Sequence, residues 1–233
     1  PWPVLADAVS VSPMRAPARY QSAAGPQEAC DGRAHSSSIG AMSGTDPFFF
    51  GYGSLVNRGT HAFPQAARAR VRGWARTWKR TRLRKLAFLT AVEAPGTEIE
   101  GLIAAVPGAD WAALDEREYA YDRHAVVEID HDHGPERRLD VHIYRTRPEH
   151  DSDGSDEHPI LLSYLDTVIQ GYLTEFGEAG ARRFFDTTAG WEAPVFDDRA
   201  EPVYSRVTRL TSDERTFVDD ELRLRGVRRI TSL

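Results

Sequence analysis

Residues 48–55 read Phe-Phe-Phe-Gly-Tyr-Gly-Ser-Leu, so three aromatic residues run without a polar break into a tyrosine that stands between two glycines. A short, uninterrupted apolar run predicts a buried strand, here Phe48–Tyr52, that ends in a tight loop. Gly51 and Gly53 let the backbone turn and leave the amide N–H groups of the loop unobstructed by side chains. Such a loop can bind carboxylate or carbonyl oxygens.

The sequence after this strand predicts more strands and one short helix. Segments rich in aromatic and β-branched residues, bounded by turn residues, predict strands over Arg70–Trp78, Leu86–Val92, Glu98–Val106, Ala125–Asp130 and Leu139–Tyr144. The helix is expected over Trp111–Tyr119, with Asp110 as its N-cap. The acidic, polar stretch Arg147–His158 is expected to be a solvated loop.

Helices are expected after this loop. Apolar residues at helical spacing from Leu161 predict the first, and Gly177 supplies its stop signal. A short helix is expected over Ala179–Phe185, and Thr211-Ser-Asp-Glu214 is a capping-box sequence that opens a last helix ending near Arg223. Strands first and helices later predict an α+β fold, with a mostly antiparallel, barrel-like sheet and a helical C-terminal part.

The composition predicts a globular protein with a small-molecule or protein partner. Of the 233 residues, 41% are hydrophobic, and the formal net charge is -6 at pH 7. The acidic balance argues against a nucleic-acid partner, and no window approaches the roughly 18 consecutive apolar residues of a membrane span. The lone cysteine, Cys30, cannot form an internal disulfide, which favours a reducing, cytoplasmic location. The sequence leaves the oligomeric state open.

Residues 1–41 differ in composition from the rest of the chain. Proline is interleaved there with alanine, serine and glycine, and no apolar periodicity persists, so this segment cannot bury a core. We expect a disordered extension over 1–41, a single domain over 42–233, and translation starting at Met42. The apolar stretch of a secretory signal is not expected in this segment.

A serine nucleophile at Ser54 is one candidate chemistry. A nucleophile elbow requires glycine two positions before and two positions after the serine, where this chain has Tyr52 and Val56. The pattern therefore fails, and a covalent serine hydrolase stays an alternative only.

The end of the predicted short helix offers a candidate carboxylate. Trp111, Leu114 and Glu118 share one helix face, so Glu118 follows the apolar residues toward the core. Desolvation there would raise its pKa toward neutrality, as a glutamate that takes and returns a proton requires. From the pattern alone, a solvated carboxylate at a surface helix end is slightly favoured. The spacing implies no ion pair between Glu118 and the adjacent Arg117.

Histidines and arginines supply two further candidates. His131 and His133 are spaced as metal ligands on one strand face, but they precede a Gly-Pro turn where exposed polar residues are common, and no cysteine lies near. A solvated pair is favoured, and no metal is expected. The basic, aromatic run Gly73–Lys85 could line an anionic substrate channel. More often such arginines lie on the outer face of a strand and pair with acids.

Two motifs together resemble signatures of the γ-glutamylcyclotransferase superfamily, especially its ChaC-like branch. They are Phe50-Gly51-Tyr52-Gly53-Ser54-Leu55 and Leu114-x-x-Arg117-Glu118-x-x-Tyr121. Between them, Glu100-Gly101-Leu102-Ile103 is similar to a Gly-x-Leu strand of the family, and the resemblance extends over Phe48–Tyr144. It implies a small β-barrel flanked by helices.

The resemblance also implies an activity, the conversion of a γ-glutamyl compound to 5-oxoproline and a free amine without a cofactor. Glu118 matches the catalytic glutamate of the family, and Tyr204, in Pro202-Val203-Tyr204, resembles a tyrosine that faces the site. The residues that match the substrate-binding loop are Tyr52, Gly53, Ser54 and Leu55. A catalytically silent protein that binds a small carboxylate is the alternative. The sequence does not show which γ-glutamyl substrate is used, whether glutathione or another, or which amine leaves. The role of Arg147–His158 does not follow from it either.

Overall fold

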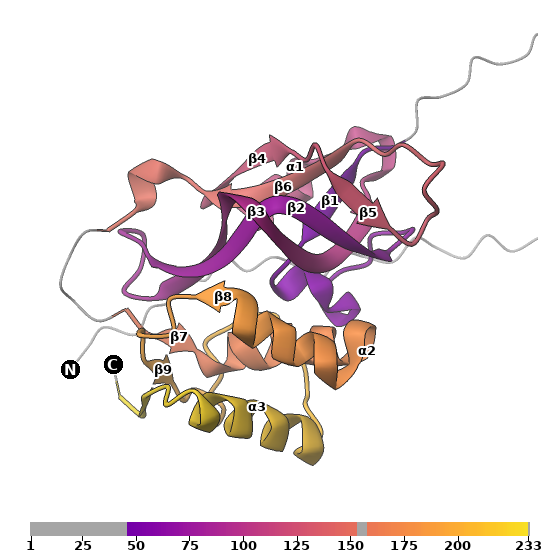
Figure 1. The fold of residues 1–233 in the computed structure, drawn as a ribbon. Coiled ribbons are helices and arrows are strands. Elements are labelled where there is room, and N and C mark those ends of the chain that lie inside the picture. Colours follow the sequence, from indigo (N-terminus) through magenta and orange to yellow (C-terminus); the bar gives the residue numbers. More distant parts are fainter. Residues whose placement is uncertain (1–45, 153–157, 233) are drawn as a thin grey trace, which may run out of the picture. The chain divides into compact units, whose positions relative to one another are not determined.

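The computed structural model describes residues 46–152 and 158–232 (Figure 1). The disordered extension expected over 1–41 and the start expected at Met42 lie outside the described residues. The described part of the loop expected over Arg147–His158 contains a 3-10 turn, η4 (Pro148–His150).

The main sheet has the strand order β4-β6-β1-β3-β2-β5, and β8 pairs with β2 outside this path. The strands are β1 (Phe48–Gly51), β2 (Ala67–Arg80), β3 (Ala87–Ala105), β4 (Tyr121–Ala125), β5 (Ile129–His131), β6 (Val141–Thr146) and β8 (Thr188–Ala189). Strand β1 pairs in parallel with β6, and β2 with β8, whereas the other neighbours are antiparallel. The expectation of a mostly antiparallel sheet is confirmed.

The expected closed barrel is wrong, because the edge strands β4 and β5 do not pair with each other in the described sheet. The strand expected over Ala125–Asp130 is divided: Ala125 ends β4, Ile129 and Asp130 belong to β5, and residues 126–128 cross between them. Val126 N–H donates to the Val141 carbonyl of β6, whereas the Glu128 carbonyl accepts from Arg72 N–H of β2. This segment thus connects β4, which pairs with β6, to β5, which pairs with β2. The two edge strands do not pair, so the sheet stays open.

Strand β1 is buried on both faces of the sheet. Phe48 and Phe50 face the principal core, whereas Phe49 faces a second cluster that contains Leu55 and Leu114. Because β1 lies between β3 and β6, its exposure to water is at most 1% at each phenylalanine. The buried strand expected from the three phenylalanines is confirmed, and the chain leaves it at Gly51.

Strands β2 and β3 form a long hairpin. The two strands expected over Leu86–Val92 and Glu98–Val106 are parts of the single strand β3. Residues 94–97 of β3 oppose Gly73 alone, which has a φ of 79°. Pro95 and Gly96, the turn residues between the two expected strands, lie in this bulge.

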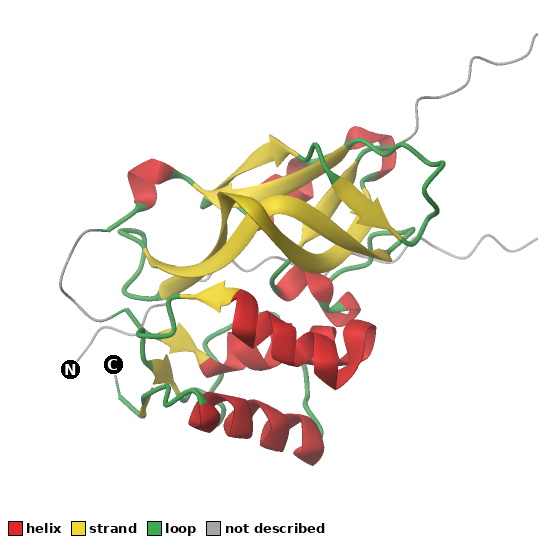
Figure 2. Cartoon of the chain, in the orientation of Figure 1, coloured by secondary structure: helices red, strands yellow, loops and turns green. Residues whose placement is uncertain are grey.

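The described residues contain three α-helices, and the largest of them covers the sheet. They are α1 (Ala112–Arg117), α2 (Leu162–Thr187) and α3 (Ser212–Leu224), and short 3-10 helices are η1 (Ser54–Val56), η2 (Arg58–Thr60) and η3 (Pro107–Ala109). Figure 2 shows α2 between the sheet and α3. Gly177 has a φ of 66° and kinks α2 where the sequence predicts a stop before Ala179–Phe185. The capping box between Thr211 and Glu214 is present.

A second sheet makes the C-terminal part mixed rather than helical. Its strands, β7 (Ile160–Leu161), β9 (Val195–Phe196) and β10 (Arg229–Ile230), pair in parallel in the order β10-β9-β7. Each strand has two residues, which is too short for the alternating pattern that identifies a strand in a sequence. The expectation of a helical C-terminal part therefore omitted this sheet.

Gly101 of β3 supports the loop that follows β1. A Cβ atom at this position would lie 2.3 Å from the Gly51 carbonyl oxygen and 2.6 Å from the Phe50 ring. We therefore expect Gly101→Ala to lower the free energy of unfolding by about 1–3 kcal/mol, as overpacked cores do. Urea denaturation measures the change. Gly59→Ala is the control, because its nearest contact, at 3.0 Å, is a side-chain oxygen; equal losses would show that the backbone contact is unimportant.

Candidate active site

The loop after β1 borders a small pocket. The segment Tyr52–Leu55 lines a cavity of about 30 Å³, which is room for roughly one water-sized group. The N–H groups of the next two residues donate to the Gly53 and Ser54 carbonyls at 3.0 and 3.1 Å. A Cβ at Gly53 would lie 2.5 Å from the Tyr164 hydroxyl. Glycine is required there because Tyr164 packs directly on the loop.

Tyr52 is held in place by the backbone of the sheet. Its hydroxyl donates to the Tyr144 carbonyl at 2.6 Å and accepts from Ala91 N–H at 3.0 Å. Burial raises the pKa of Tyr52, and the negative charge of Glu118 raises it further, so the phenol is neutral at physiological pH. These contacts commit the hydroxyl to the scaffold and leave the ring and backbone of Tyr52 to line the pocket.

Helix α1 brings Glu118 to the same pocket. Leu114, 1% exposed, packs in the cluster that contains Phe49 and Leu55, so the helix and the loop share one apolar anchor. Glu118 follows the last helical residue with φ -100° and ψ 31°, and its side chain is 16% exposed. Glu118 therefore lines the small pocket and is not a solvated side chain at a surface helix end.

Arg117 joins Glu118 to the loop. Its Nε lies 3.2 Å from Glu118 Oε1, and its Nη2 donates to Ser54 Oγ at 3.1 Å. Its Nη1 donates to the Thr60 carbonyl at 3.0 Å. The spacing of these neighbours did not imply this ion pair, which forms because Glu118 has left helical geometry and the usual divergence of adjacent helical side chains no longer applies.

The charge state of Glu118 is set by opposing effects. Burial raises the pKa of this carboxyl group above its ordinary value, whereas the positive charges of Arg117 and Arg206 oppose that rise. The net shift is upward. A carboxylate with a raised pKa in a pocket can take a proton from a substrate and return it.

A wider cavity of about 180 Å³ adjoins the small one. The residues that line both are Ser54, Leu89, Glu118, Tyr121 and Tyr164. The wide pocket is also lined by Tyr204, Arg84 and Arg206. Glu118 therefore stands where a space for one polar group opens into a space for a larger molecule.

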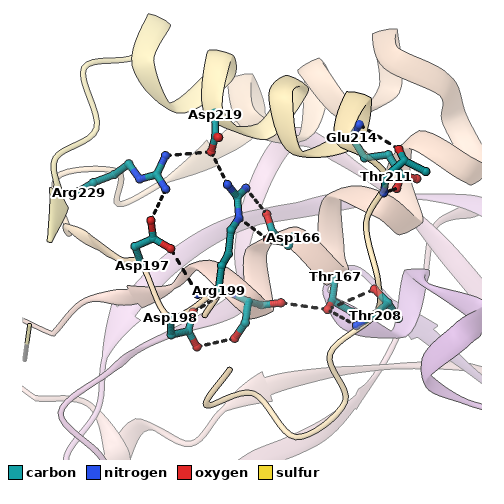
Figure 3. A network of polar contacts seen from close by, with 11 residues as sticks. Asp166, Thr167, Asp197, Asp198, Arg199, Thr208, Thr211, Glu214, Asp219 and Arg229 are labelled. Atoms are coloured by element: carbon teal, nitrogen blue, oxygen red, sulfur yellow. Dashed lines mark hydrogen bonds and ion pairs between the residues drawn. The ribbon is translucent and has the colours of Figure 1, made fainter. Parts of the chain in front are cut away.

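A buried polar network holds the C-terminal wall of the wide pocket (Figure 3). Asp198, 3% exposed, accepts from the Ser163 N–H at 2.8 Å, from the Ser163 hydroxyl at 2.5 Å and from Val203 N–H at 2.9 Å. Ser163 and Val203 precede Tyr164 and Tyr204, whose rings pack edge to face with centroids 5.1 Å apart. Asp198 thus positions both tyrosines of the wall.

The neighbouring Arg199 fastens this segment to the C-terminal helices. It contacts Asp166 of α2 and Asp219 of α3, each at 2.7 Å. Arg229 of β10 reaches the same Asp219 at 2.9 Å, as Figure 3 shows. The segment that carries Tyr204 and Arg206 is therefore tied to α2, α3 and the second sheet.

The structure brings Glu118 and the loop Tyr52–Leu55 to the small pocket and places Tyr204 at the wide one, whereas His131 and His133 line neither. The sequence interpretation missed Tyr164 and Arg206 as residues of the candidate site, and it considered Arg84 only in the less favoured reading of the basic run as a substrate channel. Arg84 belongs to the basic run that the sequence read as an outer strand face, and it lies on the turn after β2. Arg206 follows Tyr204 by two positions, and that proximity was the available signal.

The geometry gives little support to a serine nucleophile at Ser54 or to a metal site at His131 and His133. The Ser54 hydroxyl accepts a hydrogen bond from Arg117, which is a cation and not a general base. His131 and His133 lie with ring centroids 6.1 Å apart, and His133 Nε2 contacts the Gln65 carbonyl. Within the described residues, no three His, Cys, Asp or Glu side chains converge as metal ligands. No described helix has the length and apolarity needed to cross a membrane.

Part of the chain that contains the candidate site matches a known protein family. Residues 49–163 match a protein family described as "Gamma-glutamyl cyclotransferase, AIG2-like". No curated protein matches the sequence. This stretch contains the loop, Glu118 and Tyr121 but ends before Tyr164, Tyr204 and Arg206.

Solved structures are similar at low sequence identity. One titled "Gamma-glutamyl cyclotransferase" is 15% identical, with 75% of this chain and 99% of that chain covered and a TM-score of 0.47. An uncharacterized protein from Homo sapiens is also 15% identical, with the same coverage and a TM-score of 0.49. A γ-glutamyl cyclotransferase specific to glutathione from yeast is 13% identical, with 76% and 97% covered and a TM-score of 0.38.

Proposed function

Since this chain belongs to the γ-glutamylcyclotransferase-like superfamily through residues 49–163, we propose that it converts a γ-glutamyl peptide or amine to 5-oxoproline and a free amine without a cofactor. The observation that carries the proposal is the position of Glu118, a carboxylate 16% exposed that lines both pockets. A cytoplasmic location is part of the proposal, because the chain has a lone cysteine.

The reaction needs little beyond positioning and proton transfer. The α-amine nitrogen of the substrate attacks its own γ-carbonyl carbon, the new N–C bond closes a five-membered lactam, and the amide bond to the departing nitrogen breaks. Glu118 takes a proton from the α-ammonium and delivers it to the departing nitrogen. The second proton that the attacking nitrogen loses as the lactam forms also passes to the departing amine, which leaves as an ammonium. Because both reacting groups belong to one molecule, holding them close supplies effective molarities on the order of 10⁵–10⁸ M.

The two pockets suggest a division of roles. The small pocket, bordered by Gly53, Ser54 and Leu55, has room for one substrate oxygen group, and the loop amides are suited to bind its developing negative charge. Tyr164 and Tyr204 form an aromatic wall for the remainder of the substrate in the wide pocket. Glu118 lies between the two spaces, as a group that serves both nitrogens must.

A catalytically silent carboxylate-binding protein is the second candidate. It is favoured by the contact between Arg117 and Glu118, since a purely structural carboxylate would also pair with an arginine. Incubation with glutathione, γ-glutamyl dipeptides and γ-glutamyl amines, followed by mass spectrometry for 5-oxoproline, tests the proposed activity. Product from any of these substrates supports it. Calorimetric binding without product would favour the silent protein.

Arg206 is expected to set the pH dependence of the reaction. Its positive charge favours the ionised form of Glu118 and lowers the pKa of that carboxyl group. In Arg206→Gln the pKa of Glu118 rises, so the proton-accepting carboxylate forms only at higher pH. The acid limb of the kcat/KM profile should therefore move to higher pH.

The control for this measurement is Arg209→Gln, which removes the same charge from an exposed side chain on the same segment. Its profile should match that of the unaltered protein. If the acid limb moves to lower pH in Arg206→Gln, or stays in place, the carboxylate that acts in the reaction is not the one that Arg206 faces.

A further inference from the structure

Two arginines on the wall of the wide pocket form no ion pair within the described residues. Arg84 and Arg206 both line this pocket, and within residues 46–152 and 158–232 neither donates a hydrogen bond or forms an ion pair. Arg206 is partly buried, whereas Arg84 is exposed. Arg117, the remaining arginine of the wall, forms an ion pair with Glu118 and donates hydrogen bonds to Ser54 and Thr60.

The charges that line the wide pocket do not balance. Its ionised groups are Arg84, Arg117, Arg206 and the carboxylate of Glu118. Arg117 and Glu118 lie 3.2 Å apart and offset each other, so the charges of Arg84 and Arg206 are in excess. The γ-glutamyl head of a substrate carries one ammonium and one carboxylate and cannot offset that excess. A ligand with a further negative charge can.

We propose, on the basis of the function proposed above, that Arg84 and Arg206 bind a carboxylate on the departing part of the substrate. The substrate is then a γ-glutamyl amino acid or peptide with a free carboxyl terminus, rather than a γ-glutamyl amine. Guanidinium groups bind carboxylates through paired, charge-assisted hydrogen bonds. A departing group that carries an ammonium would be repelled by the same two cations.

The position of Glu118 indicates that the departing part of the substrate lies in the wide pocket. The departing nitrogen must lie beside Glu118 to receive its proton, and the small pocket has room for only one polar group. The departing part therefore extends into the wide pocket of about 180 Å³, whose wall carries Tyr204, Arg84 and Arg206. Partial burial of Arg206 strengthens its interaction with a carboxylate relative to that of a fully solvated side chain.

Three substrates that differ in the departing part test the proposal. They are γ-glutamyl-alanine, its C-terminal amide, and the γ-glutamyl derivative of 1,5-diaminopentane, which carry a negative, a neutral and a positive departing group. We expect kcat/KM for 5-oxoproline formation to be roughly 10- to 100-fold higher for the acid than for its amide, and lowest for the cation. Similar values for acid and amide would overturn the proposal.

Variants of single arginines test which side chains cause the preference for the acid over the amide. Arg206→Gln and Arg84→Gln should each reduce the acid-to-amide ratio, whereas Arg209→Gln and Arg82→Gln, exposed neighbours outside the pocket, should preserve it. A changed pKa of Glu118 affects both substrates equally and cancels in this ratio. An equal loss for acid and amide would instead assign the arginines to the γ-glutamyl head and overturn the proposal.

Binding to Glu118→Gln separates this inference from the catalytic one. Calorimetry on that variant gives the ratio of Kd values for the amide and the acid without turnover. If no substrate yields 5-oxoproline with the unaltered protein but the Kd ratio still favours the acid and depends on Arg206, the proposed activity fails and carboxylate recognition stands. If neither compound binds and no product forms, both fail.

Discussion

Replacing Glu118 with glutamine is expected to lower kcat/KM for 5-oxoproline formation by roughly 10²–10⁴-fold, the usual contribution of a positioned general acid or base. Glutamine has nearly the same shape, and its amide oxygen can still accept from Arg117 Nε, which lies 3.2 Å from the carboxylate. It cannot accept and return a proton. The expected loss is therefore in chemistry, while the contacts of the loop with Arg117 are kept.

The control for this substitution lies two residues earlier, on helix α1. Glu116 is exposed, and Glu116→Gln removes one carboxylate without altering either pocket. Both variants should keep the thermal unfolding midpoint of the unaltered protein, and only Glu118→Gln should lose 5-oxoproline in the mass-spectrometric assay. Near-normal turnover in a folded Glu118→Gln protein would falsify the assignment of the general acid and base.

The helix pattern left two readings of Glu118 open, and the resemblance of Leu114-x-x-Arg117-Glu118-x-x-Tyr121 to a family motif singled it out. Leu114 precedes it by four positions and is buried, so its periodicity points the carboxylate toward the interior. The pairing with Arg117 was missed because it depends on φ and ψ at the residue where the helix ends. Such local backbone geometry leaves no trace in side-chain spacing.

Residues far along the chain were harder to place. Tyr164 and Arg206 lie more than 100 positions after the loop in the sequence, and they reach the site through α2 and the network around Asp198. No local pattern reports such tertiary proximity. The strands of the main sheet were largely predicted, but its open form was not, since the crossing over 126–128 depends on hydrogen bonds to two different strands, β6 and β2.

Arg76 contradicts the expectation that the arginines of the basic run lie on an outer strand face. Its residue exposure is 2%, and its guanidinium donates to the Tyr172 hydroxyl at 2.6 Å and to the Glu100 carbonyl at 3.0 Å. It also donates to Thr187 and Thr188 and lies 4.7 Å from the centroid of a phenylalanine ring. The strand pattern places Arg76 on the inner face with Trp74 and Trp78, and neutral acceptors surround its charge.

Arg76→Ala is expected to lower the free energy of unfolding by about 3–5 kcal/mol, because it opens a cavity and removes several hydrogen bonds to a buried cation. The Tyr172 hydroxyl also lies 3.0 Å from the Tyr52 carbonyl, so the loss should extend to the substrate-binding loop and raise KM. Urea denaturation and steady-state kinetics measure the two effects. An exposed arginine on the same strand, in Arg72→Ala, should change stability by at most about 1 kcal/mol.

Arg76→Met separates the volume of this side chain from its charge. Methionine fills much of the space, and the acceptors keep other partners: Thr187 and Thr188 hydroxyls donate to carbonyls of α2, and the Tyr172 hydroxyl lies 2.7 Å from the Glu100 carbonyl. Few polar groups are then left unpaired, so Arg76→Met should cost clearly less stability than Arg76→Ala. An equal loss in both variants would mean that the charged hydrogen bonds, rather than packing, hold α2 against the sheet beneath the loop.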